Sequence, residues 1–355
     1  MRHNPLMRIV VLYGGESPER DVSSASGTSV ARALLDRGHE VVLVDPAAET
    51  PVPARSLQPG DAVDTFVVGE EPPSLSDRQR LRRRMHAALT GGPVLEMLRG
   101  AELVFLALHG GWGEDGYVQE LLRKAGVRFT GAAGAACAGA WHKGRAQAAL
   151  DAAGLPVAER VLWRPAGAGE VPEDVRRLVA AGPVVTKPVA DGSSVSVHRV
   201  DSLSQLDRIA AEVSADDEAE LLVEPFLPGR EFAVAVVGDR VLPVIEIELT
   251  TPLFDYAAKY QPGAVNEVCP ARVPADFASR LQELALRAHD ALGFGGNAYS
   301  RTDFRCDAAG EPMCLEVNAL PGLTATSLLP LAAAGAGWTY PDLIQRIVDL
   351  AVEDI

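Results

Sequence analysis

The sequence is poor in paired cysteines and in positive charge. It has four cysteines in 355 residues, with no C-x-x-C pair and no cysteine–histidine cluster of zinc spacing, which argues against a disulfide scaffold and a structural zinc site. Its net charge of −15 argues against a nucleic-acid-binding protein, because no basic field exists to displace counterions. No apolar run approaches transmembrane length, and the N-terminal one is too short for a signal peptide. We therefore expect a cytoplasmic protein with reduced thiols.

Two common nucleotide-binding signatures are also missing. The chain has no GxxxxGK[ST] phosphate loop, and no GxGxxG follows the first predicted strand, which disfavours hydride transfer on a dinucleotide. What is present is a composition ordinary for a globular enzyme, with 47% hydrophobic and 23% charged residues. The chain is long enough for two or three domains with substantial cores.

The order of apolar segments predicts an α/β domain followed by two α+β lobes. MRIVVLYGG, SSASGTSVARALLDRG and HEVVLVDP predict a strand, a helix and a strand, and AELVFLALHGG begins a second such unit. We therefore expect an open α/β domain over residues 1–131. From residue 132 the pattern favours antiparallel strands and long helices, which predicts two lobes facing each other, over residues 132–224 and 225–355.

The segment RTDFRCDAAGEPMCLEVN, residues 301–318, predicts a β-hairpin that turns at DAAGEP. Folding about that turn sets Asp303 opposite Glu316 and Arg301 opposite Asn318, all on one face because strand side chains alternate. Two carboxylates, an amide and a guanidinium suit Mg²⁺ and polyphosphate, since hard cations prefer oxygen ligands completed by substrate phosphates. The alternative interpretation of these residues is a solvated outer sheet face carrying an ordinary salt bridge.

A second polar segment, KPVADGSSVSVHRV, joins two predicted strands. Lys187 offers a cation to phosphate oxygens, and the small residues Gly192, Ser193 and Ser194 let backbone N–H groups and hydroxyls approach a phosphate closely. A plain polar hairpin with a solvent-reaching lysine is the alternative.

The stretch LLVEPFLPGREF offers groups that a nucleoside needs. Glu224 provides a carboxylate for an exocyclic amine, the Leu227 backbone a donor for a ring nitrogen, and Phe226 an apolar cover, while Glu231 can accept ribose hydroxyls. The alternative is that both glutamates sit at solvated strand ends.

Taken in order, these segments resemble the D-alanine–D-alanine ligase family of the ATP-grasp superfamily. The most specific pieces are GGESPERDVSSASG, LALHGGWGEDGYVQ, KPVADGSSV, FDYAAKY and RTDF with LEVNALPGLTATSLLP. The resemblance spans nearly the whole chain and is weakest over residues 46–100. It implies an ATP-grasp fold, ATP-dependent synthesis of D-alanyl-D-alanine for peptidoglycan, and a homodimer formed through the N-terminal domain.

The resemblance also assigns roles to individual residues. It implies that Lys143, Lys187 and Lys259 contact ATP phosphates, that Glu224, Phe226, Leu227 and Glu231 hold adenosine, and that Asp303, Glu316 and Asn318 bind two Mg²⁺ ions, for which Mn²⁺ can substitute. Glu19 matches the carboxylate that binds the ammonium of the first D-alanine, in a pocket also lined by His109. Ser193 and Tyr260 match the pair that ties the phosphate loop and a lid over residues 251–272 to Glu19. Arg301 and the Gly322 backbone match the oxyanion stabilisers, and Ser327 with Leu328 matches the second D-alanine's carboxylate site.

Two other functions remain open at this point. One is an ATP-grasp ligase that joins other amino acids, for instance in secondary metabolism. The other is a nucleotide-binding regulator that has kept the fold without turnover. Tyr260 follows the dipeptide-forming version of the family, so we expect an amine and not a hydroxy acid as the second substrate.

Overall fold

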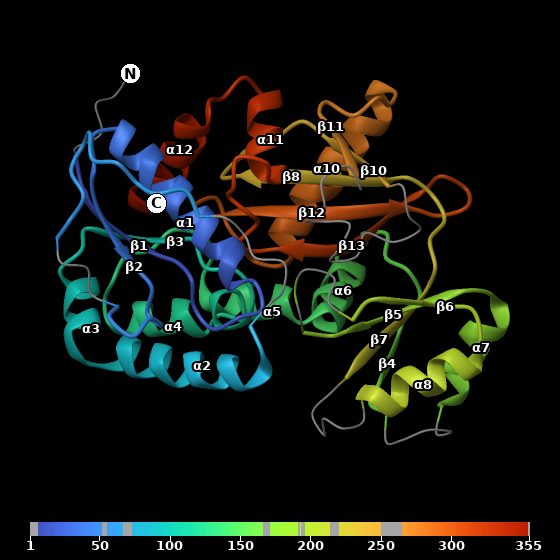
Figure 1. Cartoon of the computed structure of the whole chain (residues 1–355). Coiled ribbons are helices and arrows are strands. Elements are labelled where there is room, and N and C mark those ends of the chain that lie inside the picture. Colours follow the sequence, from blue (N-terminus) through green and yellow to red (C-terminus); the bar gives the residue numbers. More distant parts are fainter. Residues whose placement is uncertain are drawn as a thin grey trace.

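Three sheets organise the part of the chain that the structure describes (Figure 1). The structure is a computed structural model, and it describes residues 6–51, 55–66, 73–165, 171–190, 192, 196–213, 220–249 and 265–353. None of the helices in these ranges is both long and apolar enough to cross a membrane.

The first sheet is parallel and has the strand order β2-β1-β3, formed by β1 (Arg8–Leu12), β2 (Glu40–Val44) and β3 (Leu103–Leu106). Helix α1 (Arg20–Asp36) connects β1 to β2, so the predicted β-α-β unit is confirmed. The strands are nearly continuous apolar runs because helices cover a parallel sheet on both faces. The other helices of this region are α2 (Leu75–Thr90), α3 (Gly92–Arg99), the 3₁₀ turn η1 (Gly111–Gly113) and α4 (Tyr117–Lys124).

The second sheet is antiparallel and has the order β4-β7-β5-β6. Its strands are β4 (Val161–Trp163), β5 (Val184–Pro188), β6 (His198–Val200) and β7 (Leu221–Pro225). Helices α7 (Glu173–Ala181) and α8 (Leu203–Val213) bury their apolar faces against it. Figure 1 shows both helices on the side of the sheet that is turned away from the third sheet, so the opposite face is left to build a site.

The third sheet has the order β11-β10-β8-β12-β13, with β9 paired to β8. Its strands are β8 (Glu231–Val237), β9 (Arg240–Val241), β10 (Ile245–Leu249), β11 (Val265–Val268), β12 (Tyr299–Cys306) and β13 (Pro312–Asn318). Helices α5 (Gly134–Trp141), α6 (Lys143–Ala152) and α10 (Ala275–Ala291) share one apolar core with it. The alanine-rich α5 and α6 thus join the third sheet, although they precede the second sheet in the chain.

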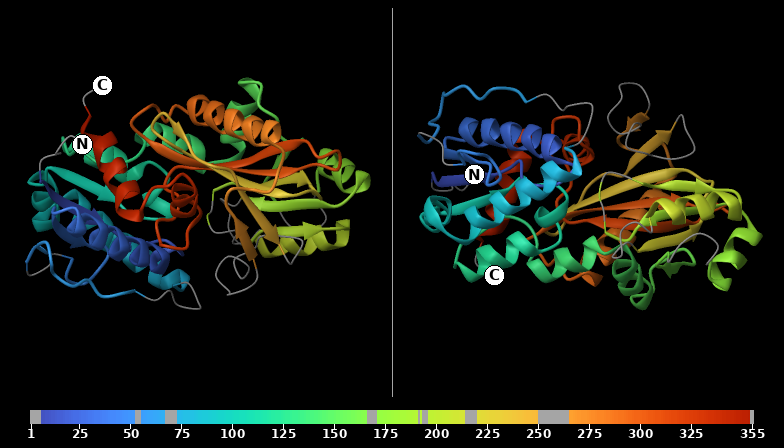
Figure 2. Two further views of the ribbon diagram at one scale, coloured as in Figure 1. Left: turned by 90° about the horizontal axis from the view of Figure 1, so that it is seen from above. Right: turned by 60° about the horizontal axis from the view of Figure 1, so that its bottom comes forward.

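The last two helices return to the first core. Helices α11 (Leu328–Gly335) and α12 (Tyr340–Val352) bury apolar side chains in the same cluster as β1 and β3. Thr339 and Asp342 form a capping box at the start of α12, which satisfies backbone N–H groups there. The views of Figure 2 show α12 beside the N-terminal helix. The division at residues 131 and 224 stays a prediction, because each core draws on segments that are distant in the sequence.

Candidate active site

The predicted hairpin is present with the predicted register. β12 and β13 pair so that Asp303 lies opposite Glu316 and Arg301 opposite Asn318. A β-bulge follows Asp303, where the register shifts before Phe304. Such a bulge re-aims the side chains beside it and is common next to functional sites.

Arg301, Asp303 and Asn318 form one hydrogen-bonded group on this face. Arg301 donates from Nε and Nη2 to the two oxygens of Asp303 at 2.7 Å each, and Asn318 Nδ2 donates to Asp303 Oδ2 at 3.1 Å. Burial opposes the charge of Arg301, but the carboxylates of Asp303 and Glu316 outweigh burial and raise the pKa of its guanidinium. Arg301 therefore carries a fixed positive charge in a set orientation.

Two lysines approach the hairpin from other elements. Lys143, the first residue of α6, has its Nζ 3.6 Å from Glu316 Oε2. Lys187 on β5 has its Nζ 2.6 Å from Glu224 Oε2 on β7, and both side chains are nearly inaccessible. Burial lowers the pKa of Lys187, but Glu224 and then Glu316 outweigh this effect and raise it. The structure thus brings together the cations and carboxylates that the sequence assigned to polyphosphate and metal.

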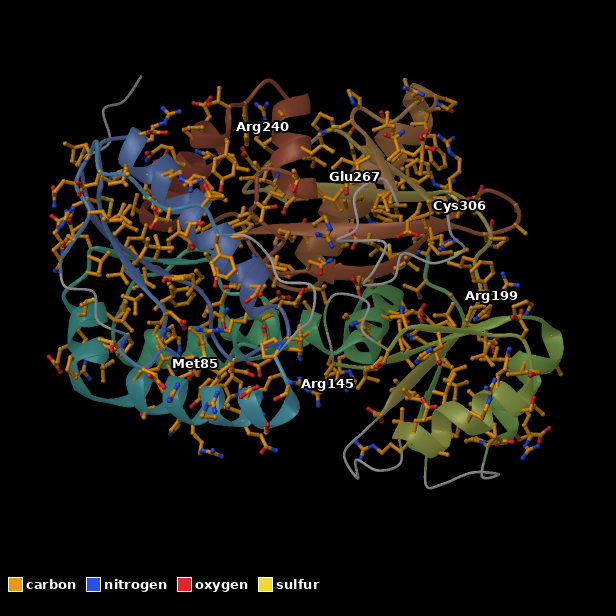
Figure 3. The ribbon with its side chains drawn as sticks, viewed as in Figure 1. Met85, Arg145, Arg199, Arg240, Glu267 and Cys306 are labelled. Carbon is orange, nitrogen blue, oxygen red and sulfur yellow. The ribbon has the colours of Figure 1, made fainter. Side chains whose placement is uncertain are left out.

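Phe226 lies among guanidinium groups at the edge of this cluster. The Arg199 guanidinium carbon is 4.5 Å from the ring centroid and that of Arg305 is 5.1 Å from it. Arg305 Nη1 also lies 3.2 Å from Glu231 Oε2, and Leu227 is half-buried directly after Phe226. In Figure 3, Arg199 lies between the second sheet and Cys306 at the end of β12. The predicted adenosine residues therefore lie where the second and third sheets meet, with Glu224 on β7 and Glu231 on β8.

Glu19 is the N-cap residue of α1 and lies against two glycine-containing loops. A Cβ at Gly110 or at Gly192 would overlap Glu19 Oε2, so both backbones approach this carboxylate closely. Gly110 also has a φ of +65°, a conformation that favours glycine. The segment containing Gly192 is the predicted phosphate loop, so the structure places part of that loop beside Glu19 as expected.

His109 connects the N-terminal sheet to the loop after β13. Its Nδ1 donates to the Leu320 carbonyl oxygen at 3.1 Å, since a carbonyl can only accept, and its Nε2 therefore accepts from Ser26 Oγ at 2.8 Å. Ser26 Oγ in turn accepts from the Leu323 N–H at 3.3 Å. Burial lowers the pKa of His109 to about 4, so the ring is neutral at pH 7. His109 therefore links α1 to the loop after β13, beside the predicted first-substrate pocket.

Gly322 and Ser327 lie together at the start of α11. A Cβ at Gly322 would lie 2.7 Å from Ser327 Oγ. Ser327 Oγ accepts from the Thr324 N–H at 3.1 Å and is 2.7 Å from the Thr324 hydroxyl. Leu328, the first residue of α11, is buried. These contacts shape a compact polar turn at the position predicted for the second carboxylate.

Four predicted residues, Ser193, Ser194, Lys259 and Tyr260, lie outside the described residues. The same is true of residues 251–264 of the predicted lid.

Three further residues belong to the cluster but were not assigned a role from the sequence. Glu114 accepts from the Gly110 N–H at 2.8 Å, and burial together with Glu19 raises its pKa to about 8. Arg305 pairs with Glu231, as described above, and Gln147 donates to Glu224. Gln147 follows Lys143 by one helical turn, so spacing alone places both on one face of α6. Glu114 stands within the HGGWGEDG segment already singled out for His109.

Comparison with known proteins identifies the family. The sequence profile of the D-ala D-ala ligase N-terminus family matches residues 8–132, and that of the D-ala D-ala ligase C-terminus family matches residues 149–349. The chain belongs to the D-alanine–D-alanine ligase family. It is 38% identical over 342 residues to D-alanine–D-alanine ligase of Anaeromyxobacter sp. (strain Fw109-5), covering 96% of both chains.

Solved structures agree with this membership. The chain shares its fold with D-alanine–D-alanine ligase from Bacillus anthracis complexed with ATP, with a TM-score of 0.73, 23% identity, and 98% and 97% of the two chains covered. It is also similar to VanG D-Ala:D-Ser ligase from Enterococcus faecalis, with a TM-score of 0.73, 27% identity, and 98% and 100% of the chains covered. The predicted ATP-grasp fold of the D-alanine–D-alanine ligase family is thereby confirmed.

Proposed function

We propose that this protein joins two D-alanines to D-alanyl-D-alanine, with release of ADP and phosphate, as a step in peptidoglycan precursor synthesis. The observation that carries this proposal is the polar face of the β12–β13 hairpin, which the fold sets against Lys143 and Lys187. Family membership over nearly the full chain and the ATP complex of the Bacillus anthracis relative support it.

The first chemical step is activation of a carboxylate. A carboxylate is a poor electrophile, so its oxygen first attacks the γ-phosphorus of ATP, which gives an acyl phosphate and ADP. Catalysis of this phosphoryl transfer depends on positioning the reactants and on neutralising the negative charge of the phosphates. We assign the phosphate contacts to Lys143 and Lys187, and the adenosine contacts to Glu224, Phe226 and the Leu227 backbone. Glu231 is assigned to the ribose hydroxyls.

The hairpin face fits Mg²⁺ bound together with ATP. Mg²⁺ takes one or two carboxylates and completes its octahedron with substrate phosphates. Asp303 and Glu316 face each other across the hairpin, and Asn318 adds an amide beside Asp303. We assign these three residues as the ligands. When bound, Mg²⁺ neutralises the charge that develops on the transferred phosphoryl group.

The first D-alanine is assigned to the space beside Glu19. An ammonium group needs a carboxylate partner, and Glu19 lies against the Gly110 loop and the predicted phosphate loop. The charges of Glu19, Arg301 and Glu316 all act on the nearby Glu114. The neutral His109 fixes the neighbouring wall through its bonds to Ser26 and Leu320.

The second step is attack of an amine on the acyl phosphate. The resulting tetrahedral oxyanion needs donors at fixed positions, and each donor contributes about 3 kcal/mol in known oxyanion sites. We assign this role to Arg301, whose guanidinium is held by Asp303, and to the Gly322 backbone N–H. Ser327 and Leu328 are assigned to the carboxylate of the second D-alanine.

Three further assignments complete the proposal. A lid over residues 251–272, carrying Lys259 and Tyr260, excludes water from the acyl phosphate, and Ser193 links the phosphate loop to Glu19. The protein works in the cytoplasm as a homodimer.

A substrate screen tests the function and separates it from the alternatives. Purified protein with ATP and Mg²⁺ is supplied with each enantiomer of alanine and serine, and with D-lactate, while ADP and dipeptide are measured. D-Serine is included because the VanG relative is a D-Ala:D-Ser ligase. Multiple turnovers with D-alanine alone are expected. Turnover with L-alanine but not D-alanine would refute the specificity, and release of no more than one ADP per protein would favour a regulator.

A further inference from the structure

Gln147 lies between the second and third sheets. It stands on α6 one turn after Lys143 and has no exposed surface. Its Nε2 donates to Glu224 Oε1 at 2.5 Å and to the Leu315 carbonyl oxygen at 3.2 Å. One amide group therefore joins β7 of the second sheet to β13 of the third sheet.

The orientation of this amide is decided by its partners. A carboxylate and a main-chain carbonyl can only accept, so the group that faces both must be the NH₂ and not the oxygen. Oε1 is left buried, with no hydrogen-bond partner among the residues that the structure describes. A buried polar atom without a partner is costly. The fold tolerates that cost here while keeping two donors of Gln147 on their acceptors.

These bonds fix the orientation of the Glu224 carboxylate. Its Oε1 accepts from Gln147 and its Oε2 lies 2.6 Å from Lys187 Nζ, so the carboxylate is held at both oxygens. Lys187 supplies the neutralising charge, whereas Gln147 supplies a neutral donor that fixes the carboxylate plane. A carboxylate fixed in this way presents its remaining lone pairs in one direction. It accepts from an N–H group and repels a carbonyl oxygen at the same point.

We propose that Gln147 is a positioning residue that sets Glu224 to accept the exocyclic amine of adenine and to reject guanine. Guanine carries a carbonyl oxygen where adenine carries that amine, so discrimination depends on holding Glu224 still. This inference rests on the proposed function, because it takes the nucleotide to bind beside Glu224.

Binding calorimetry with ADP and GDP tests the inference without turnover. Gln147→Met keeps the length of the side chain and removes both donors. We expect its Kd for ADP to rise about tenfold, the effect of losing a hydrogen bond to a charged group, and its preference for ADP over GDP to shrink. The control is Gln282→Met on α10, which removes the 3.0 Å hydrogen bond that Gln282 donates to the Leu242 carbonyl, away from this cluster. The control should retain the wild-type Kd for both nucleotides.

Steady-state kinetics adds a second readout. The Gln147→Met variant should show a raised KM for ATP with little change in kcat and in the KM for D-alanine. An unchanged Kd for ADP and an unchanged nucleotide preference in a folded variant would overturn the inference, and so would a loss of kcat with an unchanged KM for ATP. If Gln147→Met does not fold, Gln147→Asn replaces it, since its amide falls one methylene short of Glu224. The same two results, measured for Gln147→Asn, would then overturn the inference.

The two proposals fail in distinguishable ways. Wild-type protein that binds no ADP and releases none with D-alanine would refute the proposed function. Wild-type protein that turns over normally, with variants of Gln147 that bind ADP and GDP as it does, would refute this inference alone.

Discussion

Mild acid should destabilise this protein through His109. The ring is buried between α1 and the loop after β13, where its Nδ1–H donates to Leu320 and its Nε2 accepts from Ser26. Protonation of Nε2 would add a second donor against a hydroxyl that now donates to it, in a site without water access. The folded protein therefore favours the neutral ring.

The magnitude follows from the difference between two pKa values. Burial lowers the pKa of His109 from 6.5 to about 4, so the stability it contributes is complete above the unfolded pKa and is lost as pH falls toward 4. At about pH 5 the unfolded chain is almost fully protonated at this residue and the folded protein is not, which corresponds to about 2 kcal/mol lost relative to neutral pH.

Urea unfolding of wild type and His109→Gln between about pH 5 and pH 7.5 measures this effect. The variant is less stable at neutral pH because two hydrogen bonds change, but its stability should fall less on acidification. The contributions of other titratable groups to the pH dependence of stability are the same in both proteins, so they cancel when the two curves are subtracted. Glu114 is one of them, and its raised pKa gives stability that is complete below 4.5 and lost as pH rises through about 8. His86→Gln, at an exposed position of α2, is the matched control for a histidine substitution. Parallel curves for wild type and His109→Gln would refute the reasoning.

The other predictions concern the charged cluster. Glu316→Ala should abolish phosphate release with D-alanine, because a proposed metal ligand is lost. Glu311→Ala, near the hairpin turn, serves as the control. Activity of Glu316→Ala within a few-fold of wild type would remove Glu316 from the metal site. Glu19→Gln should raise the KM for the first amino acid at an unchanged KM for ATP, and an unaltered value would contradict its assignment to the ammonium. Lys187→Met leaves Glu224 buried without its cation, so urea unfolding should show a loss of about 3 kcal/mol, and wild-type stability would argue that this ion pair is not buried in solution.

Local segments of the fold were predictable because their signals are local. The hairpin over residues 301–318 has period-two alternation on both sides of one turn, and those two features set its register. The β-α-β unit of β1, α1 and β2 follows in the same way from apolar runs around an amphipathic helix. The packing of α5, α6 and α12 was not predictable, since apolar residues on a helix do not state which sheet they will cover.

The chain by itself determined the residue types of the site and the family they belong to, because each motif is a short segment whose spacing survives without a fold. Tertiary structure decided which of these residues touch. His109 meets the Leu320 carbonyl across 211 positions, and Gln147 joins Glu224 to Leu315. Such bonds form only after the three sheets have packed. A buried donor or acceptor needs a hydrogen-bond partner, and packing decides which partner comes within reach. Composition and motif spacing do not predict which residues become partners.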